Sequence, residues 1–97
     1  MDRLDSISAK EGLYSFMTES NSLYQVRVSK DERTLIRTPQ GNDSKRNLRK
    51  DNQEIKIVGE FSIVVGEAAT FILEPLGDLV DGTIRITNIV KIITYIH

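Results

Sequence analysis

Residues 12 to 38 read GLYSFMTESNSLYQVRVSKDERTLIRT, and this stretch decides the fold class. In its centre, Tyr24, Val26 and Val28 alternate with polar side chains, and a period of two is typical of a half-buried β-strand. Polar segments of turn-forming residues separate this strand from a similar short segment on either side. The stretch therefore predicts three consecutive antiparallel strands, a β-meander that needs no crossover connection.

The two flanking segments support the same prediction. Before the central strand, Tyr14 and Phe16 share one face, and the polar turn at residues 19–22 makes the pair of strands a hairpin. After it, residues 34–38 supply β-branched side chains until Pro39, which cannot donate a hydrogen bond to a neighbouring strand. We therefore expect the meander to end at residue 38.

A second set of strands is predicted in residues 54–96. Gly59 interrupts the first apolar alternation, so we expect a bulge or bend there, because glycine tolerates backbone conformations that other residues avoid. A second alternation and a turn-rich connection, residues 75–82, follow before the last strand. The residues expected on one face of the first two strands are Ile55, Ile57, Phe61, Ile63 and Val65, then Ala69, Phe71 and Leu73.

The isoleucine-rich run Ile89–Ile96 fits two structures. Its apolar residues match the spacing of a helical stripe, but β-branched residues favour a strand. We favour a strand that is either buried on both faces or lies at an edge covered by a partner. An edge strand would also allow a homodimer through Ile89–Ile96.

The fold class is therefore all-β, a small open barrel or two-sheet sandwich of about five to seven short antiparallel strands. The chain forms a single domain, residues 1–97. Residues 1–11 are expected to be a tail or a short helical turn, and residues 12–38 the meander. Residues 39–53 are expected to be a long flexible basic loop, and residues 54–96 to hold the second strand set.

The composition excludes several classes of chemistry. The chain contains no cysteine, which removes disulfides and thiolate sites, and its one histidine is His97. No Gly-rich phosphate-binding motif occurs, so we predict no cofactor, no metal and no enzyme. The first residues carry no secretory signal and no apolar run reaches about 18 to 20 residues, so the expected location is cytoplasmic, without a membrane segment.

The basic loop provides the candidate binding residues. The whole chain has a net charge of -1, but residues 37–56 carry six positive and three negative side chains, a local charge of about +3. Such a patch can contact an acidic protein surface or the phosphates of a nucleic acid. The predicted partner-binding residues are Arg37, Lys45, Arg46, Arg49 and Lys50.

These observations favour a non-catalytic binding protein that acts by occupying a macromolecular partner, and a protein partner is favoured over nucleic acid. An adaptor, a regulatory subunit or an inhibitor would fit, including one encoded by a virus or mobile element. The alternative is a small nucleic-acid-binding barrel that uses the basic loop. A remote third hypothesis is an enzyme or cation site built from Glu74, Asp78 and Asp81.

Overall fold

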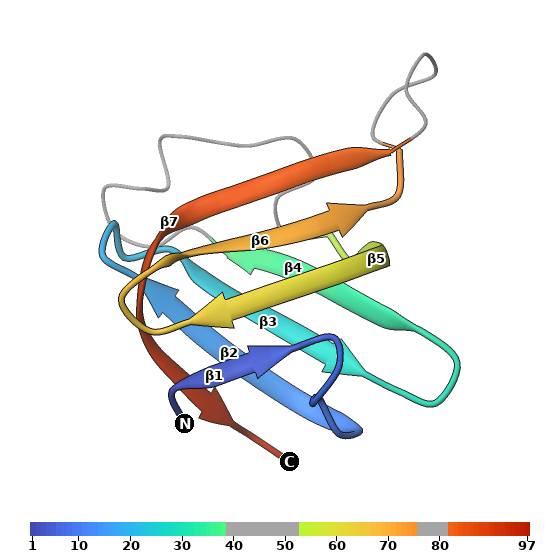
Figure 1. Cartoon of the computed structure of the whole chain (residues 1–97), viewed down its shortest axis with the longest axis horizontal. Helices are drawn as coiled ribbons and strands as arrows, with labels where there is room; N and C mark the ends of the chain where they lie inside the picture. Colours follow the sequence, from blue (N-terminus) through green and yellow to red (C-terminus); the bar gives the residue numbers. More distant parts are fainter. Residues whose placement is uncertain (39–52, 76–81) are drawn as a thin grey trace.

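Seven β-strands make up the fold in the computed structural model, which describes residues 1–38, 53–75 and 82–97 (Figure 1). The all-β prediction is confirmed. The strands are β1 (Arg3–Asp5), β2 (Gly12–Thr18), β3 (Leu23–Val28), β4 (Arg33–Thr38), β5 (Ile55–Val64), β6 (Ala68–Leu73) and β7 (Thr83–Tyr95).

Strands β2 to β7 form a closed six-stranded antiparallel barrel. Each strand pairs with the next one along the chain, and β7 returns to pair with β2, where Phe16 lies opposite Ile93. Every neighbouring pair in this ring is antiparallel. This closure joins the two predicted sets of strands into one barrel.

The two longest strands turn the corners of the barrel. The last part of β7 pairs with β2, whereas residues 83–89 pair with β6. On β5, Ile55 and Lys56 pair with β4, and residues 57–62 pair with β6. The expected irregularity at Gly59 is confirmed, since the register of β5 against β6 shifts between Ile57 and Phe61.

Strand β1 is the extra strand outside the ring, and it corrects the prediction for residues 1–11. Arg3–Asp5 pair with the last part of β5, beyond the residues that β4 covers, and Leu4 is buried opposite Ile63. We expected a tail or a helical turn that Gly12 cuts short. The burial of Leu4 against a strand some sixty positions later is a tertiary contact that local pattern does not reveal.

A hydrogen-bonded turn follows β1. The Asp5 carboxylate accepts hydrogen bonds from the backbone N–H groups of Ser8 at 2.9 Å and Ile7 at 3.1 Å, and from Ser8 Oγ at 2.9 Å. These bonds from Ser8 and Ile7, together with the charge of Arg3, lower the pKa of Asp5 from its ordinary value. The turn reverses the chain from β1 into the barrel.

The core is filled by the inward-facing side chains of the alternating strands. Phe16 stacks on Tyr24, with ring centroids 4.7 Å apart and an angle of 2° between the rings, and Phe71 lies 6.0 Å from both Phe16 and Phe61. This aromatic column joins β2, β3, β5 and β6 across the interior. The other large apolar side chains that are fully buried in the described residues are Leu35, Ile55, Ile63, Leu73, Val26 and Val90.

Candidate binding surface

Most of the predicted binding residues cannot be placed. Lys45, Arg46, Arg49 and Lys50 lie outside the described residues, so their role in partner binding stays a prediction. Arg37 lies on β4 and is 5% exposed, with Nη2 donating to Ser22 Oγ at 2.9 Å. This hydrogen bond connects β4 to the turn between β2 and β3.

Arg37 belongs to a buried polar group at the turn between β2 and β3. The Ser22 backbone N–H donates to Thr18 Oγ1 at 3.3 Å, and the hydroxyls of Thr18 and Ser20 lie 2.9 Å apart. Thr18 and Ser22 are 0% and 2% exposed. Buried hydroxyls without hydrogen bonds are costly, so these contacts fix the turn that the sequence placed at residues 19–22. Asn21 adopts a positive φ of 65° there, which asparagine tolerates.

The carboxylate hypothesis receives no test from the structure. Glu74 accepts a hydrogen bond from the Lys56 backbone N–H at 3.2 Å, and Asp78 and Asp81 lie outside the described residues. Within residues 1–38, 53–75 and 82–97, no group of three His, Asp or Glu side chains gathers closely enough to hold a metal ion. The same part of the chain contains no helix that could cross a membrane.

The described surface is most unusual on the outer face of β5, β6 and β7. Ile84 and Ile86 on β7 are 72% and 67% exposed, Val58 on β5 is 56% exposed and Ile72 on β6 is 41% exposed. Ile72 lies directly opposite Ile84 in the sheet, Ile86 follows on the same face of β7, and Val58 lies on the next strand, β5. We call these four residues the outer apolar patch.

The inner face of β7 explains why its isoleucines point outward. Thr87 Oγ1 accepts a hydrogen bond from the backbone N–H of Ala69 at 3.0 Å, at the point where the register between β6 and β7 shifts. Thr87 is 8% exposed, and with it Arg85 and Thr83 face the interior side. Because successive side chains alternate, Ile84 and Ile86 are left on the solvent side.

The isoleucine-rich run is a strand, as favoured, but it is not buried on both faces. Val90 and Ile93 are buried, whereas Ile89, Ile92 and Ile96 are 40%, 55% and 43% exposed. One edge of residues 90–95 is occupied by β2, which closes the barrel. Dimerisation through this run stays a prediction, and its exposed isoleucines extend the apolar surface of β7 beyond the outer apolar patch.

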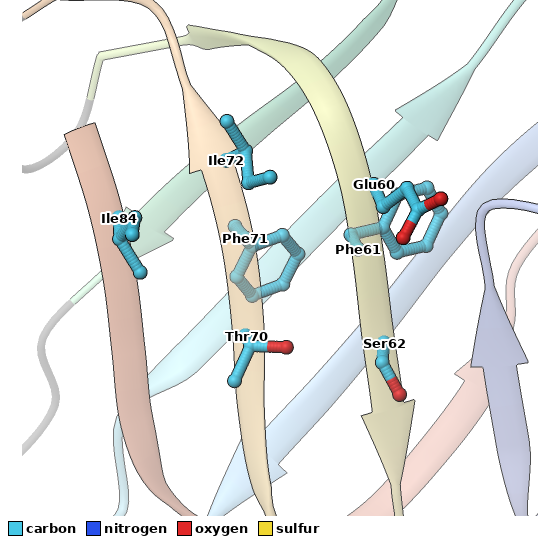
Figure 2. Close-up of a pocket in the computed structure, with 7 residues that line it drawn as sticks. All are labelled: Glu60, Phe61, Ser62, Thr70, Phe71, Ile72 and Ile84. Carbon is cyan, nitrogen blue, oxygen red and sulfur yellow. The ribbon is translucent and has the colours of Figure 1, made fainter. Parts of the chain in front are cut away.

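A shallow depression of about 190 Å³ adjoins the patch and is lined by residues of β5, β6 and β7 (Figure 2). Ile72 and Ile84 are the aliphatic residues of its lining, and Glu60, Ser62 and Thr70 are the polar ones. The backbone at Phe61 and Phe71 lies beneath, with both rings turned into the core. A small apolar hollow with a few polar groups is the arrangement that proteins use to receive one side chain of a partner.

The alternating isoleucines of β7 are visible in the sequence, but their pattern does not identify which face of the strand is exposed. Ile84 and Ile86 alternate regularly with Thr83, Arg85 and Thr87, but alternation shows only that two faces differ and does not show which face is covered.

Comparison of the chain with models of known families, with curated proteins and with solved structures finds no match.

Proposed function

We propose that this protein is a non-catalytic binding protein that docks on a protein partner through the outer apolar patch. The observation that supports the proposal is the exposure of Val58, Ile72, Ile84 and Ile86 on three neighbouring strands, β5, β6 and β7. Scattered exposed aliphatic residues are ordinary, whereas a connected group rimmed by polar residues is typical of an interaction site.

The size of the patch suits a protein rather than a small molecule. Its four members together expose the equivalent of roughly two whole aliphatic side chains, and burying them would contribute about 4–7 kcal/mol before the costs of association. The depression that Ile72 and Ile84 line is shallow, so a rigid small ligand would remain mostly in water. A protein surface can cover the patch and fill the depression together.

The test is affinity capture with matched variants. The tagged wild-type protein and the Ile84→Ser and Ile92→Ser variants are each incubated with a lysate of the source organism. Both positions are exposed isoleucines of β7. Ile92, however, lies in the part of β7 that pairs with β2, opposite Met17, and it is not one of the four residues of the outer apolar patch. We expect a stoichiometric protein that wild type and Ile92→Ser retain and that Ile84→Ser loses.

Two results would contradict the proposal. One is equal retention by all three proteins when circular dichroism shows all three folded. The other is turnover of a small substrate by the purified protein that a single carboxylate substitution abolishes, since this would support the carboxylate enzyme instead.

A further inference from the structure

We infer that the depression beside the outer apolar patch receives an arginine side chain of the protein partner. The inference rests on the proposed function and specifies the chemistry of the partner at that site. It is carried by the combination of one carboxylate, two hydroxyls and an aliphatic side within a hollow of about 190 Å³ (Figure 2).

Glu60 gives the depression its charge. It is the one ionisable side chain in the lining, and it is exposed on β5. No lysine or arginine of the described residues lies within 4.0 Å of its carboxylate, and the ion pair that these residues do form joins Arg27 to Glu54. The depression therefore presents an anion that this part of the chain does not neutralise.

The apolar side of the depression selects among the cations. Ile72 and Ile84 lie opposite each other on β6 and β7 and offer a surface for methylene groups. An arginine or lysine stem packs along such a surface while its charged head stays at the rim. An inorganic cation would contact Glu60 but would leave the isoleucines exposed to water.

The rim favours arginine over lysine. A planar guanidinium can donate two parallel hydrogen bonds to one carboxylate and still has N–H groups left for other acceptors. Ser62 and Thr70 lie opposite each other on β5 and β6 and provide hydroxyl oxygens at that rim. A neutral aliphatic side chain in the same place would remove water from Glu60 without replacing its hydrogen bonds.

The shape of the depression depends on Gly59. This residue lies within the irregular part of β5, and an added Cβ would lie 2.9 Å from Ile72 Cβ. The missing side chain thus allows Ile72 to lie close against β5, next to Glu60. The irregular part of β5 therefore affects the positions of both Ile72 and Glu60 in the lining of the depression.

The experiment is a titration followed by methyl NMR spectra of the full chain labelled in its isoleucine methyl groups. The probes are Nα-acetyl-arginine methylamide, the citrulline analogue, which has similar shape without charge, and the norleucine analogue. We expect the arginine probe to shift the methyl signals of Ile72 and Ile84 in a saturable way at millimolar concentrations, and citrulline to bind about fivefold more weakly. In Glu60→Gln, the preference for arginine over citrulline should disappear while the spectrum stays that of a folded protein.

Three results would overturn the inference. They are equal binding of the arginine and citrulline probes, an undiminished preference in Glu60→Gln, and shifts of the same methyl signals with protein concentration alone, which would identify a second copy as the occupant. The proposed function is tested separately by the loss of capture in Ile84→Ser. If that loss occurs while the arginine probe fails, only the chemistry assigned to the depression is wrong.

Discussion

Replacing Gly59 with alanine should destabilise the barrel, although the backbone at this position does not require glycine. Among the described glycines, positive φ values occur at Gly12 and Gly66, so Gly59 could carry a side chain without backbone strain. An alanine here would even restrict the unfolded chain, which alone would stabilise the protein by about 0.4–1 kcal/mol. The lack of space around Gly59, however, makes the expected net effect of the substitution destabilising.

The magnitude follows from three contacts with one neighbour. The added Cβ would lie 2.9 Å from Cβ, 3.0 Å from Cγ2 and 3.1 Å from Cδ1 of Ile72, whereas carbon atoms pack best at about 3.5–4.0 Å. Ile72 Cβ is attached to the backbone and cannot rotate away, so β5 and β6 must separate locally. Overpacking of this kind costs about 1–3 kcal/mol, which leaves a net loss of about 0–2.6 kcal/mol; the middle of this range, about 1.3 kcal/mol, corresponds to a fall in Tm of roughly 5–10 °C.

Urea and thermal unfolding followed by circular dichroism measure this loss. The matched control is Gly82→Ala, whose Cβ would lie 3.4 Å from the Leu73 carbonyl oxygen, an ordinary contact, and which should show no comparable loss. Adding Ile72→Ala to Gly59→Ala removes Cγ2 and Cδ1 but keeps Cβ, so the double variant should recover part of the loss. A Gly59→Ala protein as stable as wild type would refute the close packing of Ile72 on β5.

Three further predictions concern the core, the polar turn and the first turn of the chain. Phe16→Ala removes a ring stacked between Tyr24 and Phe71 and should cost about 3–5 kcal/mol in urea unfolding, whereas a change below about 1 kcal/mol would contradict its place in the aromatic column. Thr18→Val keeps the shape but loses the acceptor of the Ser22 N–H, and the same assay should show a loss of about 1–2 kcal/mol. The pKa of Asp5 is lowered by folding, so its contribution to stability is present above the unfolded pKa and is lost as pH falls through the folded pKa. An NMR titration should show this lowered pKa in wild type, and Ser8→Ala should raise it in part, because alanine removes the hydroxyl donor but keeps the Ser8 backbone N–H; an unchanged pKa in that variant would exclude the Ser8 hydroxyl as a cause.

The meander could be predicted from the sequence because its information is local. Tyr14, Phe16 and Val26 are buried at 4%, 1% and 0% exposure, on the faces that a period of two assigned to them. The polar segments between the strands are short enough to allow only hairpins, so strand direction followed as well. The bulge at Gly59 was equally local, since glycine interrupts an otherwise regular alternation.

What the sequence did not reveal depends on long-range pairing. β1 exists because Leu4 meets Ile63, and no pattern within residues 1–11 reports that contact. Val65, expected on the inner face of β5, is 36% exposed because the strand ends at Val64 and the chain turns at Gly66. The outer apolar patch was missed for a related reason, since its isoleucines look like core residues until the register with β6 is known.

The pairing of β2 with β7 also has a consequence for how the chain folds. Tyr14 lies opposite Tyr95, 81 positions later, while the other pairs in the ring connect strands that are neighbours along the chain. The hairpins can form early, but joining the first and last strands of the ring requires closure of a very large loop. We expect this step to set the refolding rate. Refolding should therefore take milliseconds to seconds, as in the slower small domains. Until that step is complete, two unpaired strand edges remain accessible, so refolding yield should fall as protein concentration rises.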